Sequence, residues 1–123
     1  MTPENAELLA DVKPMANFVF AFDSLSYKRQ VIECIEMLRD AGMDLHSNVM
    51  FYVYCDRTID GEYGFKSALE RCKILKENNT NPYVMLNIDA PPTQDMKNLK
   101  RWANRKHIFW SCQFEDYTRK VRA

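Results

Sequence analysis

The chain has 123 residues, enough for one compact domain with a hydrophobic core and too few for two ordinary domains. Its 17 basic and 17 acidic side chains balance, so no overall field attracts nucleic acid, an anionic membrane or an acidic substrate. No apolar segment approaches the roughly twenty residues of a membrane helix, and the first residues lack the basic and apolar regions of a signal peptide. We therefore expect a cytoplasmic protein without nucleic-acid or membrane partners.

The four cysteines are far apart and form no CxxC or CxxxCxxC cluster; they are Cys34, Cys55, Cys72 and Cys112. Cys34 and Cys72 fall in predicted helices and Cys55 ends a predicted strand. This distribution is typical of reduced cysteines that serve as small apolar residues. We expect neither a disulfide nor a metal site.

The N-terminal sequence Thr2-Pro3-Glu4 is typical of a helix start. It offers a capping hydroxyl, a proline at the first helical position and an acid near the positive end of the helix dipole. We expect this short helix to end by Pro14 and the first strand to begin at Asn17 or Phe18.

Three runs of apolar, aromatic and β-branched residues each end at a carboxylate, and a stretch with helical periodicity follows each one. The runs are residues 17–24, 48–56 and 82–89. The run at 48–56 shows no polar alternation, which is typical of a strand covered by helices on both faces. We expect it to be the buried central strand of a parallel sheet.

Two amphipathic helices separate these runs. Residues 27–41 place Val31, Ile35 and Leu38 on one stripe, and Gly42 stands where a residue in the left-handed conformation ends a helix. A second helix is predicted from about residue 65 to 77, because apolar residues repeat there at intervals of three and four.

The segment after the third run starts with a helix signal. Thr93 is a predicted cap, and the helix after it carries Met96, Leu99, Trp102 and Ala103 on one side. Residues 107–110 predict a short buried segment or a helical turn. A last short helix is predicted from about Phe114 to the basic C-terminal end.

Alternating strands and helices at roughly thirty-residue spacing predict successive βα units with right-handed crossovers. The expected fold class is α/β, with three βα units and a parallel sheet. Residues 1–123 form one domain: an N-terminal helix and linker (1–15), the βα units (16–117) and a basic tail (118–123). The two edge strands of such a sheet have unpaired backbone groups that can bind another strand. We therefore expect this chain to be part of a larger assembly.

Polar side chains gather at the carboxyl ends of the predicted strands, where parallel α/β proteins bind their ligands. They are Asp23, Ser24, Tyr54, Asp56, Arg57, Asn87 and Asp89. Acids and amides at these positions also cap the following helix. Each of these residues could therefore contact a ligand or cap a helix, and the sequence does not decide between the two roles.

Known catalytic motifs are absent from the sequence. His46 and His107 have no carboxylate or cysteine at triad or metal spacing, which favours a structural or surface role. The three glycines form no GxGxxG motif and no phosphate loop. We predict no catalytic residue and no metal ligand in this chain.

Several segments, taken together, resemble a known family. They are Phe20-Ala21-Phe22-Asp23-Ser24, Arg39-Asp40-Ala41-Gly42-Met43, Val49-Met50-Phe51-Tyr52-Val53-Tyr54, Asn81-Pro82-Tyr83-Val84-Met85 and residues 99–109. Their order and spacing resemble the second half of the radical S-adenosylmethionine (SAM) core domain, units four to six of a (β/α)6 partial TIM barrel. The likeness extends from about residue 16 to 117. The first half of that domain, with its CxxxCxxC loop, has no counterpart here.

In that family a [4Fe–4S] cluster cleaves SAM to a 5′-deoxyadenosyl radical. The resemblance implies that Asp23 and Ser24 contact the ribose and methionine part of SAM. Ala21 stands where relatives often have a serine, which departs from the pattern of the ribose contact. Arg29 would hold the methionine carboxylate through its planar fork of donors.

The resemblance also places the adenine of SAM. Its apolar and backbone contacts would come from Tyr52, Tyr54 and residues 85–87, which include Asn87. Asp89, which ends the same strand at the same edge of the sheet, is a further expected cofactor contact.

These observations leave two functions open. The chain is expected to be the C-terminal half of a radical SAM enzyme core, which contributes SAM and substrate contacts, lacks the cluster ligands and is inactive alone. The alternative is a non-catalytic half-barrel that self-associates and acts as a binding or regulatory module. Its partner is thus a cluster-bearing N-terminal half or further copies of itself. The chain alone has no expected cofactor; SAM and a [4Fe–4S] cluster are implied only for a completed barrel.

Overall fold

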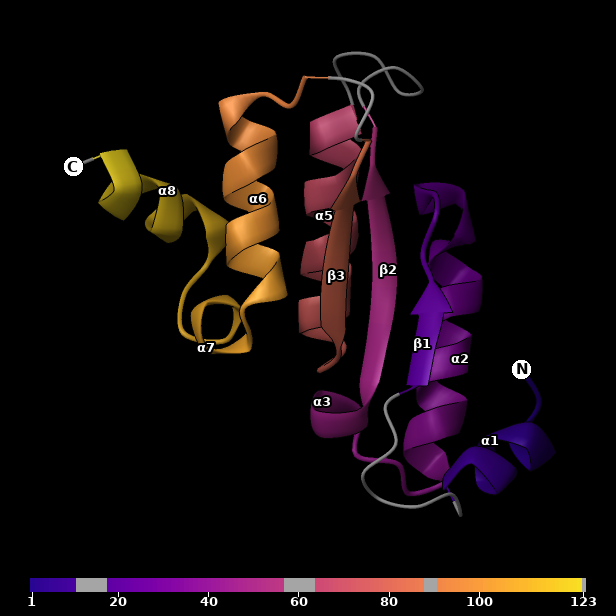
Figure 1. Cartoon of the computed structure of the whole chain (residues 1–123). Coiled ribbons are helices and arrows are strands. Elements are labelled where there is room, and N and C mark those ends of the chain that lie inside the picture. The colour runs from indigo at the N-terminus through magenta and orange to yellow at the C-terminus, as the bar shows by residue number, and fades with distance from the viewer. Residues whose placement is uncertain (11–17, 57–63, 88–90, 123) are drawn as a thin grey trace.

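The computed structural model describes residues 1–10, 18–56, 64–87 and 91–122. Figure 1 shows how their helices and strands are arranged. In chain order they are α1 (Pro3–Ala10), β1 (Phe18–Ala21), the 3-10 helix η1 (Leu25–Tyr27), α2 (Lys28–Asp40), α3 (Leu45–Asn48), β2 (Val49–Cys55), α5 (Gly64–Glu77), β3 (Asn81–Leu86), α6 (Gln94–Asn104), α7 (Lys106–Phe109) and α8 (Phe114–Arg122).

Within the described residues the sheet has three parallel strands in the order β1-β2-β3. Phe18 pairs with Val49, and Met50 pairs with Asn81. Strand order follows chain order and such crossovers are right-handed, so the crossover helices α2 and α5 lie on the same face of the sheet. In Figure 1 both helices lie behind the strands, and no helix covers the front. The expected α/β class, with three βα units and a parallel sheet, is confirmed.

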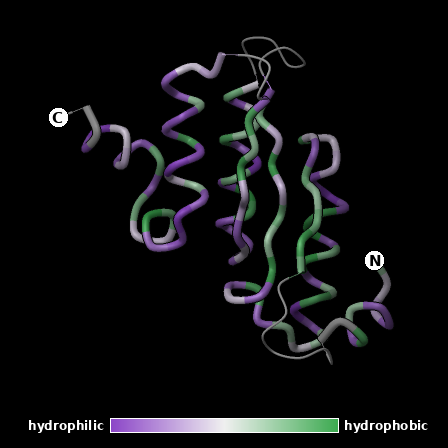
Figure 2. The backbone as a smooth tube through the Cα atoms, viewed as in Figure 1, coloured by the Kyte–Doolittle hydropathy of each residue, from purple (hydrophilic) through white to green (hydrophobic). Residues whose placement is uncertain are grey.

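The central strand β2 is covered on one face only. Phe51 is 1% exposed and Val53 and Cys55 are 0% exposed, whereas Tyr52 between them is 38% exposed. The expectation that helices cover this strand on both faces was therefore wrong. Its residues are apolar or aromatic throughout, and Figure 2 colours most of the strand from white to green, but α2 and α5 lie on a single side.

Local signals set the limits of α2. Val31, Ile35 and Leu38 form its buried stripe, as their spacing predicts. The helix ends at Asp40, and Gly42 follows two residues later with a φ of +91°, the left-handed conformation expected there. The N–H of Met43 donates to the carbonyl of Leu38 at 3.1 Å and so satisfies one of the last carbonyls of the helix.

The third βα unit follows the sequence signals as well. Asn79, with φ of +61°, makes the turn between α5 and β3. Thr93 caps α6, since its hydroxyl accepts a hydrogen bond from the N–H of Met96 at 3.2 Å. The residues predicted to face the core from α6 are buried: Met96, Leu99, Trp102 and Ala103.

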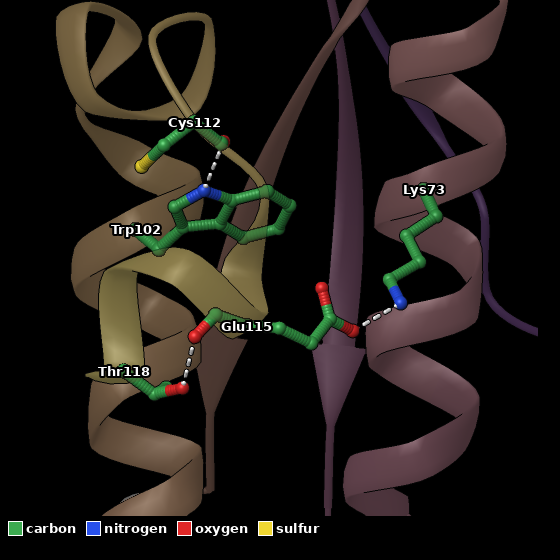
Figure 3. Close-up of polar contacts among 5 residues, drawn as sticks. All are labelled: Lys73, Trp102, Cys112, Glu115 and Thr118. Atoms are coloured by element: carbon green, nitrogen blue, oxygen red, sulfur yellow. Dashed lines mark hydrogen bonds and ion pairs between the residues drawn. The ribbon is translucent and has the colours of Figure 1, made fainter. Parts of the chain in front are cut away.

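The C-terminal helices are fastened to α5 and α6 through Trp102 and Lys73. Trp102 is fully buried, and its indole N–H donates to the carbonyl of Cys112 at 3.0 Å (Figure 3). Lys73 of α5 forms an ion pair with Glu115 of α8, and the carbonyl of Glu115 accepts from the Thr118 hydroxyl at 3.0 Å (Figure 3). These contacts hold α7 and α8 against the outer side of the domain.

Lys76 adds a further link to the same region. Its ammonium donates to the carbonyl of Cys112 at 2.9 Å and to the carbonyl of Phe109. It also lies 5.5 Å from the centre of the Trp102 ring, within the range of a cation–π contact. Burial lowers the pKa of Lys76, so this contact is made at some cost in desolvation.

Candidate functional site

One side of the sheet carries no helix among the described residues. We call it the open face; its residues are Val19, Ala21, Met50, Tyr52, Tyr54, Tyr83 and Met85. Val19 is 44% exposed, and Tyr52, Tyr83 and Met85 are 36% to 38% exposed. Parallel sheets normally bury both faces, so this apolar surface is suited to a ligand or a partner.

Aromatic rings stand side by side on the open face. Tyr52 and Tyr83 are paired across β2 and β3, and their ring centroids are 5.9 Å apart in an edge-to-face arrangement. Tyr54 and Met85 form the next pair toward the carboxyl ends of the strands. Aromatic and thioether groups at this spacing offer a flat apolar surface against which a planar ring can stack.

The carboxyl ends of the strands form what we call the rim. Asp56 follows β2 and is only 2% exposed. The side-chain amide of Asn87, which follows β3, donates to its carboxylate at 3.3 Å. The rim therefore joins β2 and β3 through polar side chains, as the positions of the two residues predict.

Arg71 of α5 is fully buried beneath the rim. Its guanidinium donates to the carbonyls of Phe22 at 2.8 Å, Tyr54 at 3.0 Å and Ser67 at 3.3 Å. The planar fork of donors thus ties the ends of β1 and β2 to α5. Arg71 was not predicted as a site residue, although it stands inside an apolar helix stripe between Ala68 and Cys72.

Of the residues proposed for SAM contact, three lie on the same part of the sheet and two are held by local partners. Tyr52, Tyr54 and Asn87 share the open face and the rim. Ser24 caps η1, because its hydroxyl oxygen accepts from the N–H of Ser26 at 3.2 Å. Arg29 is exposed and pairs with Glu33, one turn along α2, at 3.1 Å.

The remaining two predicted contacts are Asp23 and Asp89. Asp23 is exposed directly after the buried Phe22, at the end of β1. Asp89 lies outside the described residues. The described part of the predicted site is thus centred on β2 and β3.

The two edges of the sheet differ. At β3, the side-chain amide of Asn104 accepts from the N–H of Val84 at 2.6 Å and donates to its carbonyl at 3.0 Å. Beside β1 lies a cavity of about 510 Å³, lined mainly by residues of β1 and α2. The chain therefore closes one edge with its own side chain and leaves a hollow at the other.

The described thiols do not fit a [4Fe–4S] cluster, which needs closely spaced thiolates. Cys55 and Cys72 are fully buried, and burial raises the pKa of Cys72. Cys34 and Cys112 lie on other parts of the chain. Among the described residues no three His, Cys, Asp or Glu side chains gather as metal ligands.

Fold and site together define an α/β protein with one covered and one open sheet face. Comparisons with protein-family models, curated proteins and solved structures found no match to the chain. None of the helices in the described ranges has the length and apolar character needed to cross a membrane.

Proposed function

We propose that this chain is the C-terminal half of a radical SAM enzyme core. It acts in the cytoplasm, contributes contacts to SAM and substrate from the open face and the rim, and is inactive alone because it lacks cluster ligands. The observation that supports this most directly is that the crossover helices α2 and α5 both lie on one face of the parallel sheet, and no described helix covers the other face. The inner wall of an incomplete α/β barrel has this arrangement.

The side chains on the open face suit the adenine of SAM. Tyr52 and Tyr83 provide ring faces and edges, and Met85 adds a polarizable thioether beside them. The amide of Asn87, held toward Asp56, lies at the rim where the polar parts of a ligand bind in parallel α/β proteins. In this proposal Arg71 is a positioning residue, since it fixes the backbone that carries Tyr54.

The cluster of a completed enzyme would supply the electron that cleaves SAM. It must come from another half, because the thiols described above do not fit it. The residues of this chain would bind and orient SAM and shield it from water. We expect weak binding by the isolated chain, because half of the binding surface is missing.

Titration of the isolated chain with SAM, followed by NMR, tests this function. We expect shifts in the tyrosine-ring and methionine-methyl signals of Tyr52, Tyr83 and Met85. Tyr52→Ala should weaken binding about fivefold or more, the effect of losing one aromatic stacking contact. The matched control is Tyr27→Ala, which removes a more exposed tyrosine outside the open face. Unchanged signals at saturating SAM, or equal effects of the two variants, would reject the proposed site.

Anaerobic reconstitution with iron and sulfide tests the proposal that the isolated chain lacks cluster ligands and is inactive. We expect no stoichiometric iron or sulfide on the purified chain and no cleavage of SAM. A chain that assembles a cluster by itself would not be the cluster-free half of an enzyme.

A second candidate function is a non-catalytic half-barrel that self-associates as a binding or regulatory module. The specific observation that favours it is the hollow edge of β1, beside which the chain places no strand among the described residues. The two functions differ in SAM binding, which only the first requires.

A further inference from the structure

The outer edge of β1 has free backbone hydrogen-bonding groups. The N–H of Phe22 donates to the carbonyl of Tyr52 at 2.9 Å, so the backbone groups of Phe22 point toward β2. The backbone groups of alternate residues in a strand point to opposite edges, so those of Val19 and Ala21 point away from β2. Within the described residues, no group outside the sheet bonds to them.

A helix stripe beside this edge lines a cavity. The lining of this cavity of about 510 Å³ includes Phe20 and Ala21 of β1, Gln30, Cys34 and Met37 of α2, and Met1 at the N-terminus. These three α2 residues follow one another at intervals of four and three, so they form a stripe along one side of the helix. The free edge of β1 and this stripe of α2 therefore lie beside the same cavity.

The opposite edge shows that this chain can protect a strand. Asn104 occupies both backbone groups of Val84. Pro82, two residues earlier on the same edge, has no N–H to donate. Edge strands of natural proteins are normally blocked in such ways, and β1 lacks any such block among the described residues.

The free groups of β1 are self-complementary. If a two-fold axis passes beside Phe20 at right angles to the sheet, Val19 faces Ala21 of a second copy and Ala21 faces its Val19. In antiparallel strands, two such residues exchange both N–H and C=O bonds. The same axis places the α2 helices of both copies on one side of the joined sheet, where the stripes that line the two cavities face each other.

We propose that two copies of this chain associate through antiparallel pairing of β1 with β1, which joins their sheets into one continuous sheet. Asn104 stops further growth at both outer ends. The contact is isologous and closed, as in most symmetric dimers. It would occupy the edge that a completing half needs, so a dimer and a completed barrel exclude each other.

The contact is small. It is about as long as α2, roughly 20 Å for 13 residues, and it spans two layers about 10 Å apart. This is less than the roughly 800 Å² per partner of stable complexes. We therefore expect a dimer that dissociates on dilution through the micromolar range.

Sedimentation velocity across that concentration range tests the proposal. Val19→Lys/Ala21→Lys places like charges opposite each other twice in the paired strands, and should raise the dissociation constant about tenfold or more. Val19→Lys/Ala21→Glu places opposite charges there, and should keep the dimer. Both variants alter the same exposed positions, and thermal unfolding of each shows whether the domain stays folded.

A wild-type chain that is monomeric at all concentrations would overturn the inference. A Lys/Lys variant as dimeric as the Lys/Glu variant would do the same, since the contact would then lie elsewhere. The inference does not require SAM binding. A monomeric chain that binds SAM would reject the dimer and leave the proposed function standing, and a dimer without SAM binding would do the reverse.

Discussion

The side chain of Asn104 replaces a neighbouring strand for Val84. Its amide accepts from the Val84 N–H at 2.6 Å and donates to the Val84 carbonyl at 3.0 Å, which are the two bonds that a fourth strand would form there. A carboxamide has the same donor and acceptor as a peptide group, so it fits this role where most side chains do not. The last residue of α6 thus determines where the sheet ends.

Asn104→Asp should weaken this closure, because a carboxylate accepts from the Val84 N–H but cannot donate to the Val84 carbonyl. We expect the free energy of unfolding to fall by about 1–2 kcal/mol, the range for a lost hydrogen bond with one partner left unsatisfied. Urea denaturation measures this loss, and hydrogen exchange of the Val84 amide should become faster. Lys100→Ala, an exposed change on the same helix, should stay within about 0.5 kcal/mol of wild type. Equal stability of Asn104→Asp and wild type would contradict the role of the amide.

Arg71→Met should destabilise the protein much more than a surface arginine substitution. It leaves the buried carbonyls of Phe22 and Tyr54 without their donor, and we expect a loss of about 2–4 kcal/mol in urea denaturation. Arg71→Lys should recover only part of this loss, because an ammonium cannot reproduce the planar fork. The control is Arg39→Met, where an exposed guanidinium gives up one hydrogen bond to the carbonyl of Asn78. A mild effect of Arg71→Met would show that the rim does not depend on this side chain.

Features that are determined by residues close together in the sequence could be predicted from it. The stripe of α2, its end at Gly42 and the cap of α6 at Thr93 each rest on side-chain spacing or on one conformationally special residue. Burial on the two faces of β2 could not be predicted in this way, because both faces are apolar. Which of them is covered depends on the side to which both crossover helices turn.

The candidate site shows the same limit. The rim residues Asp56 and Asn87 follow from the ends of strands, whereas Arg71 contacts Phe22, which is 49 residues away in the sequence. No periodicity indicates such a pairing. Ser24 and Arg29 bond instead to groups two and four residues along the chain, and such local partners compete with a ligand.

The ion pair between Lys73 and Glu115 should make part of the stability dependent on pH. The hydrogen bond from Lys73 lowers the pKa of Glu115 below its ordinary value of 4.5. A lowered carboxyl pKa gives stability that is present above the ordinary pKa and is lost as the pH falls through the lowered value. The difference in unfolding free energy between wild type and Lys73→Met should therefore be small, at most about 1 kcal/mol for an exposed pair, and should vanish in acid.

A control variant separates this pair from general charge effects. Lys97→Met removes an exposed lysine of α6 that forms none of the ion pairs found among the described residues. Its difference from wild type should not change across the same pH range. A Lys73→Met difference that persists at a pH where Glu115 is protonated would assign the effect to packing instead of charge.

The cysteines should fall into two classes of reactivity toward iodoacetamide. Cys55 and Cys72 are fully buried, and burial raises the pKa of Cys72, so neither should be alkylated until the protein unfolds. Cys34 and Cys112 are partly exposed and should react in the folded protein. Mass spectrometry of the labelled chain identifies the sites, and native labelling of Cys72 would contradict the described core.

Cys34 should also report the association of two copies, because it lines the cavity beside β1. Burial already raises the pKa of its thiol, and covering the cavity should slow its alkylation further as the protein concentration rises. Cys112 follows α7, on the β3 side of the domain in Figure 1, so its rate should be independent of concentration and serves as the internal control. In Val19→Lys/Ala21→Lys the alkylation rate of Cys34 should also be independent of concentration. If Cys34 in the wild-type chain reacts at the same rate at all concentrations, the β1 edge is not the contact between copies.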